Sequence, residues 1–277
     1  MNRKTALLAV FLVLATTIPL GFAQGDEGTP TAVERYQLAR EKYKNNVQAY
    51  RDARSDLVLA RQKVAVRRNA NDTAVGLERA KIFLLRSTDA MISHLEVVKT
   101  KIEVSRALPE DEKESAIAEI QSYITWLENA KGNIEAATTR QELLDIARAV
   151  RGKWAESRVS VKQITGWMLT ARLDGIIEKG EGVSTRIESR IAELNEAGKD
   201  TSKLEEMLDD YNSKIELAKE KNTAAKEKFG EIDSIEDADK LFREGHQFLK
   251  DANRYLREAY GTLKDIVREM RRLNSEG

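Results

Sequence analysis

The sequence predicts an all-α protein, an elongated bundle of about six long antiparallel helices with coiled-coil-like packing. Three observations support this fold class. Asp, Glu, Lys and Arg make up 33% of the 277 residues, above the roughly 25% of an average domain, and the chain has only three prolines. Apolar residues recur at alternating steps of four and three positions, and no segment shows the strict alternation of a strand. Capping residues stand where each repeating segment begins or ends.

The first two helices are expected at 31–68 and 73–107. Thr31 and Glu34 have the spacing of a capping box, in which each residue bonds a free backbone N–H of the first helical turn. The polar run Asn69–Asp72 then predicts a break between the two helices.

Similar signals place the remaining helices. Pro109 is expected at the first position of the third helix, followed by acidic residues that interact favourably with the positive end of the helix dipole. Thr139 and Glu142 form a second capping-box pattern at the start of the fourth helix. The last two helices are delimited by Gly198, Ser202, Gly230 and Ser234, and the sixth reaches about Leu273.

Four of the helices carry an apolar seam with a period of about 3.5 residues, which is typical of helices packed lengthwise. The sixth helix has Ala238, Phe242, Gly245, Leu249, Ala252, Leu256, Ala259, Leu263, Ile266, Met270 and Leu273. The fifth has Leu204, Leu208, Tyr211, Ile215, Ala218, Asn222, Ala225 and Phe229. The third and fourth show the same spacing, beginning at Ala116 and Leu143. Extra apolar positions beside the seam of the sixth helix favour a bundle over a two-stranded coil.

We divide the mature chain into an N-terminal helical bundle, 31–168, and a C-terminal helical bundle, 169–277. Similar breaks and seams suggest that the second bundle is a repeat of 73–168, although heptad sequences align with one another easily. In this scheme the two bundles share one long helix over 140–197, which would span roughly 85 Å at ~1.5 Å per residue.

Residues 1–23 are predicted to be a signal peptide, with Arg3–Lys4 before a short apolar segment. That segment is shorter than the roughly 20 residues of a membrane-spanning helix. We therefore expect cleavage between Ala23 and Gln24, a short linker over 24–30, and export to the periplasm, the cell surface or the extracellular space. Membrane attachment is expected only if the N-terminal segment stays uncleaved.

Gly175, Gly180 and Gly182 fall within the stretch predicted as the long fourth helix. The first two have the spacing of a phosphate-binding loop, but Glu181 stands where that loop needs a lysine, and the preceding segment is helical. Each glycine in a helix costs about 1 kcal/mol relative to alanine. We therefore interpret the three glycines as a hinge or soft point, or as places of close helix approach, and not as a ligand site.

The sequence gives little support to an enzyme. It has no cysteine, and its two histidines, His94 and His246, lack the Glu-x-x-His spacing of a carboxylate-bridged metal site in a helical bundle. Paired carboxylates such as Glu205–Glu206 lie off or beside the seams, as expected of a solvated face. We expect no catalytic residue, no cofactor and no metal, while a triad assembled only in the fold is not excluded by spacing.

Two tryptophans lie at the edges of the seams and have two interpretations. Trp126 and Trp167 either widen the core or contact a partner, because tryptophan is enriched among residues that dominate binding energy. Asn71 begins an Asn-Asp-Thr sequon and is a candidate glycosylation site in a host with the machinery.

These features favour an exported, non-enzymatic structural or adaptor protein that acts as a rigid helical scaffold for protein–protein contacts. Lys plus Arg and Asp plus Glu both number 46, so no net charge attracts nucleic acid, and export also argues against such a partner. The protein partners are unknown, and a homo-oligomer is compatible with seams this regular. The alternatives are an envelope holdase with clamping helical arms and an extracellular ligand-binding or sensor bundle.

Overall fold

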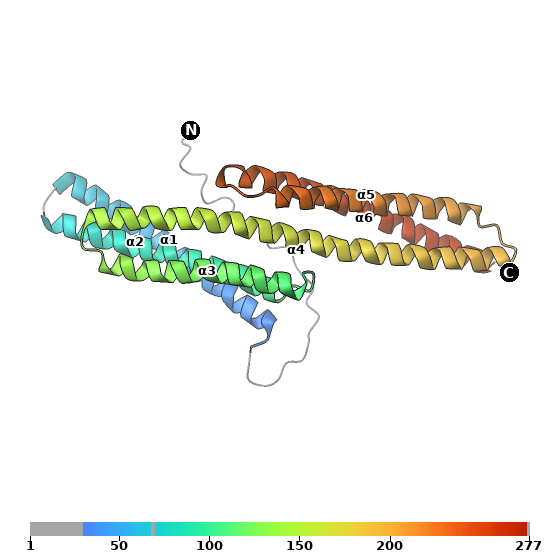
Figure 1. Ribbon diagram of the computed structural model, residues 1–277, viewed down its shortest axis with the longest axis horizontal. Helices are drawn as coiled ribbons and strands as arrows, with labels where there is room; N and C mark the ends of the chain where they lie inside the picture. Colours follow the sequence, from blue (N-terminus) through green and yellow to red (C-terminus); the bar gives the residue numbers. More distant parts are fainter. Residues whose placement is uncertain (1–29, 68–69, 276–277) are drawn as a thin grey trace.

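The computed structural model describes residues 30–67 and 70–275, and within these ranges it contains six α-helices and no strand. The helices are α1 (Ala32–Arg67), α2 (Ala70–Glu103), α3 (Glu110–Ala136), α4 (Arg140–Glu196), α5 (Ser202–Gly230) and α6 (Ile235–Ser275). They pack side by side into an elongated bundle (Figure 1), so the predicted all-α fold class is confirmed.

The 57-residue helix α4 joins the two ends of the molecule. Its N-terminal half packs with α2 and α3, and its C-terminal half packs with the α5–α6 hairpin (Figure 1). Helix α1 is peripheral, because its backbone approaches that of α2 alone among the described helices. At ~1.5 Å per residue, α4 by itself is roughly 85 Å long.

Apolar side chains fill a separate core at each end of α4. The first core includes Leu95, Ile120 and Ile134, which are fully enclosed by α2, α3 and α4. The second core includes Leu204 and Ala218 of α5 and Ile266 of α6. Phe229 lies in a further buried group where the tip of the α5–α6 hairpin meets the middle of α4.

The predicted seams coincide with the buried faces. In α5 all eight seam positions, from Leu204 to Phe229, are buried. In α6 every seam position is buried or half-buried, and none is exposed. The 3.5-residue period therefore identified which side of each of these helices faces its neighbours.

Several predicted caps are present. The hydroxyl of Thr139 accepts the N–H of Glu142, and the Glu142 carboxylate accepts the N–H of Thr139, which completes the capping box of α4. Thr31 and Glu34 form the same pair of bonds at α1. Gly198 has a φ of 75°, a left-handed conformation that glycine adopts without strain and that commonly ends a helix.

Some predicted boundaries are wrong by a few residues. Helix α2 begins at Ala70 instead of 73 and ends at Glu103 instead of 107. Because proline disfavours helical backbone angles in the residue before it, Leu108 is not expected to be helical. Leu108 is instead buried in the connection that follows the end of α2. Pro109 is consequently the N-cap of α3 and not its first helical residue.

Helix α5 is also capped differently from the prediction. Thr201, not Ser202, is its N-cap residue, and the side chain of Thr201 makes no capping bond. The Asp200 carboxylate accepts the N–H of Ser202 at 3.1 Å instead. Asp200 and Ser202 are both good capping residues, so the sequence alone did not show which of the two side chains caps α5.

Candidate functional site

The three glycines predicted as a hinge lie in an uninterrupted helix. Helix α4 continues through Gly175, Gly180 and Gly182, so their backbone N–H groups lie within the helix and do not form a phosphate-binding loop. Gly180 is a place of close approach, because the Tyr211 hydroxyl donates to its carbonyl oxygen at 3.0 Å. A Cβ at Gly175 or Gly182 would meet no atom within 4 Å. Bending at these positions stays a prediction.

The two candidate partner-contact tryptophans occupy different environments. Trp126 on α3 is half-buried and packs against the first core. Trp167 on α4 is 39% exposed and is the only one of the three tryptophans classed as exposed. Trp126 therefore fits the interpretation that the ring widens a core. Of the two candidates, Trp167 is the one that is available to a partner.

The other sequence candidates fall at or beyond the limits of the described structure. Ala23 and Gln24, the predicted cleavage site, lie outside the described residues. The backbone of Asn71 belongs to the first turn of α2, and its side chain lies outside the described part.

His94 is the centre of a cluster that the sequence did not predict. It lies on α2 between Tyr43 of α1, with ring centroids 5.4 Å apart, and Trp154 of α4, at 5.7 Å. The cluster thus brings a side chain of α1 toward α4, although their backbones do not approach closely. A seam shows which face of one helix is buried. It does not show that aromatic side chains from three helices meet.

Burial determines the charge of this cluster. It lowers the pKa of His94 from 6.5 to about 4, with a further contribution from the nearby positive charge of Arg158. Burial also raises the pKa of Tyr43 to about 12. Both side chains are therefore uncharged at neutral pH. A general acid or base is most effective when its pKa lies near the working pH, so the cluster suits packing better than proton transfer.

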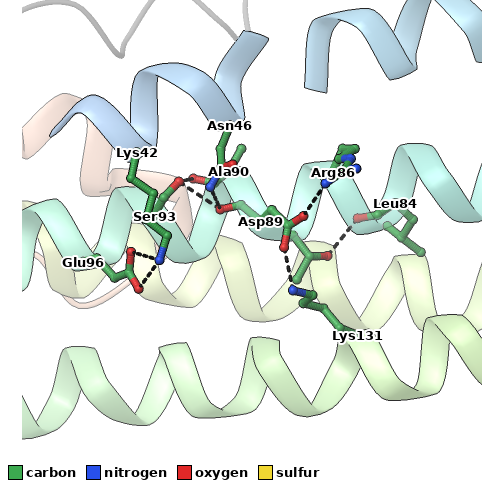
Figure 2. Close-up of polar contacts among 10 residues, drawn as sticks. Lys42, Asn46, Leu84, Arg86, Asp89, Ala90, Ser93, Glu96 and Lys131 are labelled. Carbon is green, nitrogen blue, oxygen red and sulfur yellow. Dashed lines mark hydrogen bonds and ion pairs between the residues drawn. The ribbon is translucent and has the colours of Figure 1, made fainter. Parts of the chain in front are cut away.

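A polar network lies beside this cluster and ties α2 to α1 and α3 (Figure 2). Lys42 of α1 pairs with Glu96 at 2.9 Å, and the amide of Asn46 donates to the backbone carbonyl of Asp89 at 3.3 Å. The Asp89 carboxylate pairs with Lys131 of α3 at 2.6 Å and with Arg86 at 3.4 Å.

The charge of Asp89 in this network has partners within the chain. Two cations face the single carboxylate of Asp89, so its charge is already balanced within the chain. An adjacent surface depression is lined by Ile82, Leu85, Arg86, Asp89, Lys131 and Glu135. The arrangement links helices, and the cations beside Asp89 favour a structural role for its carboxylate.

The C-terminal half contains a second buried polar contact. The Asn222 side chain is fully buried, and its amide nitrogen donates to the Thr170 carbonyl at 3.0 Å and to Asp174 at 2.8 Å. Lys226 pairs with the same Asp174 at 2.7 Å. A buried asparagine in a helix seam fixes the register of packing, since a shift would leave its NH2 group without acceptors.

A close interlock of one aromatic ring with two glycines was also missed by the sequence reasoning. A Cβ built on Gly166 of α4 would lie 2.2 Å from the Phe229 ring, and one built on Gly245 of α6 would lie 2.7 Å from it. The ring therefore occupies space that exists only because both residues lack a side chain. Gly245 was recognised as a seam residue, but only the fold shows which aromatic fills the gap.

Nothing in the described residues assembles a metal site. His94 and His246 lie in different halves of the molecule, and no group of three or more His, Asp or Glu side chains in the described ranges is arranged to hold a metal ion. None of the described helices is long and apolar enough to cross a membrane. Comparison with known proteins finds no matching family model, no similar curated protein and no similar solved structure.

Proposed function

We propose that this chain is an exported, non-enzymatic helical scaffold that presents a rigid surface to protein partners in the cell envelope or extracellular space. The observation that carries the proposal is α4, a single helix of 57 residues that is packed into a core at each end. A helix held at both ends keeps two distant surfaces at a fixed separation, which is a property that a scaffold needs.

The chemistry of the half-buried polar groups supports this proposal over an enzyme. His94 and Tyr43 are uncharged at neutral pH, and the Asp89 carboxylate faces two cations of its own chain. Each of these groups connects helices to one another. We accordingly propose Trp167, which is exposed in the middle of α4, as a contact for a protein partner.

A second candidate, an envelope holdase, is favoured by one observation. Among the described helices, α1 packs along α2 alone, and it exposes Leu38, Val58 and Leu59. An arm with accessible apolar side chains could hold an unfolded client. The seams of α3 to α6 are packed in the cores and do not offer the long apolar inner surface of a clamp.

Two measurements test the scaffold proposal. Fractionation of cells that express the full chain or a variant lacking residues 1–23 should place only the full chain outside the cytoplasm. The exported chain should bind a fluorescent hydrophobic dye no more than folded control proteins do, and it should not suppress aggregation of an unfolded client.

Other results would contradict the proposal. Strong dye binding together with suppressed client aggregation would favour the holdase. Turnover by the pure chain in a hydrolase panel, abolished by His94→Gln, would establish an enzyme. For the Trp167 contact, a photo-crosslinking residue at position 167 should give one discrete adduct in cells, whereas the same residue at exposed Glu220 on α5 should not.

A further inference from the structure

The balanced net charge of the chain conceals opposite charges on two helices. Helix α1 carries nine Lys and Arg residues against four Asp and Glu, whereas α3 carries seven Asp and Glu against two Lys. Both helices pack on α2 and neither contacts the other. The positive and negative surfaces are therefore separate within one molecule.

One flank of α1 is neutralised by α2. Arg35 pairs with Glu103, Lys42 with Glu96, and Asp56 with Arg79. The positions of these α1 residues follow one edge of the seam that α1 packs against α2. Ion pairs within the chain thus account for the charges on this edge.

The opposite flank of α1 carries a stripe of cations without such partners. The basic stripe consists of Arg40, Lys44, Arg51, Arg54 and Arg61. All five are exposed, and none forms an ion pair with another described residue. They recur at steps of four and three, with Val47 and Val58 at the two intervening positions, so they lie on one line along the helix.

A line of acids runs along α3. The acidic stripe consists of Asp111, Glu114, Glu128 and Glu135, which lie on one line of three- and four-residue steps whose four other positions, 118, 121, 125 and 132, are uncharged. Each is exposed, and none of the four carboxylates forms an ion pair among the residues that the structure describes. Lys81 of α2 donates only to the backbone carbonyl of Glu135, at 3.2 Å. Ala118 and Gly132 leave the line accessible at two of the intervening positions, whereas Gln121 accepts a hydrogen bond from Lys99 of α2 at 2.8 Å.

The two stripes are similar in length as well as opposite in charge. At ~1.5 Å per residue, the basic stripe is roughly 32 Å long and the acidic stripe roughly 36 Å long. We propose that the basic stripe of one copy binds the acidic stripe of a second copy of this chain. The inference builds on the proposed scaffold function and identifies one of its partners as the protein itself.

The position of the stripes determines the form of this contact. Because they lie on different helices, the contact is heterologous, and an open assembly retains one unused basic stripe at one end and one unused acidic stripe at the other. Further copies can add through the same contact. A polyanion such as an anionic membrane would use only the basic stripe, whereas a second copy uses both.

Sedimentation velocity over a range of protein concentrations tests the proposal. We expect the purified chain to self-associate at about 0.05 M NaCl and to do so at least about tenfold more weakly at about 0.5 M, because salt screens exposed charges. The first variant reverses the basic stripe (Arg40→Glu, Arg51→Glu and Arg54→Glu). The second reverses the acidic stripe (Asp111→Lys, Glu114→Lys and Glu128→Lys).

The variants provide a charge-exchange test. Each should be monomeric alone, and the two mixed should associate, because the first has two acidic stripes and the second two basic ones. A matched control, Lys179→Glu, Lys240→Glu and Lys250→Glu, reverses exposed lysines elsewhere and should associate like the wild type. Circular dichroism confirms that each variant is helical before it is compared.

A wild-type chain that stays monomeric at low salt would overturn the proposal, as would reversed variants that associate alone like the wild type. Binding of the wild type, but not of the basic-stripe variant, to vesicles containing anionic lipid without any self-association would assign the basic stripe to a membrane instead. These failures leave export and the absence of turnover unaffected, so they are distinguishable from failure of the scaffold proposal.

Discussion

His94 shows at the scale of one residue how burial makes stability depend on pH. Its imidazole lies between rings from α1 and α4, and a positive charge there would be enclosed by apolar groups and close to Arg158. The folded protein therefore resists protonation at this position. The unfolded chain, in which the histidine is in water, does not.

The free energy of unfolding should consequently fall as the solution is acidified. The pKa of His94 is 6.5 when unfolded and about 4 when folded. The contribution of His94 to the free energy of unfolding is therefore fully present above pH 6.5 and is lost as the pH falls toward 4. The contribution of this single group between pH 7 and pH 4.5 is about 2 kcal/mol. Urea denaturation of the wild type and of His94→Gln at the two pH values measures it.

The variant should lose about 2 kcal/mol of the wild type's pH dependence. Tyr43→Phe is the control, since it removes a neighbouring hydroxyl and leaves His94 in place. Glu269, whose pKa is lowered to about 2 by Arg272 and Lys203, titrates mainly below this range. Equal pH dependence in wild type and His94→Gln would show that His94 is not shielded from water.

At the scale of one element, α4 contains glycines of two kinds. Gly166 is a contact site, because the Phe229 ring occupies the space of its missing side chain. Gly175 and Gly182 face open space. The same residue type therefore serves packing at one position and lowers helix stability at the others.

Alanine substitution should distinguish the two kinds. Gly166→Ala should destabilise the protein by about 1–3 kcal/mol, because its Cβ would lie 2.2 Å from the Phe229 ring and the hairpin tip must move. Gly175→Ala and Gly182→Ala should each stabilise it by up to about 1 kcal/mol. Chemical denaturation of the three variants provides the comparison, and similar effects at all three positions would contradict this assignment.

The glycine series also tests the hinge. If bending at Gly175 and Gly182 is used in function, the double alanine variant should be more stable and yet less active in partner binding. Unchanged binding would leave these glycines without a functional role.

At the scale of the whole molecule, the arrangement of two cores along α4 makes the protein a rod. A compact domain of this length would have a radius of gyration of about 19 Å. Small-angle X-ray scattering at high salt, where the proposed self-association is weak, should instead give a maximum dimension above about 85 Å and a clearly larger radius of gyration. A radius near 19 Å would mean that the helices fold back into a compact particle.

The sequence by itself determined the helices and their buried faces. The eight seam positions of α5 and the capping box at Thr139 could be read directly, because both depend on residues a few positions apart on one helix. The sequence could not show that Trp167 is exposed and Trp126 is packed. Both rings lie at a seam edge, and the neighbouring helices decide which one is covered.

Only the tertiary structure decided which side chains of different helices meet. It placed His94 between Tyr43 and Trp154, filled the gap at Gly166 with Phe229, and left α1 and α3 apart, with no ion pair between them among the described residues. Helical periodicity specifies the direction of a side chain around its own axis. It does not specify the stagger or the neighbours of packed helices, which depend on how all the seams are satisfied together.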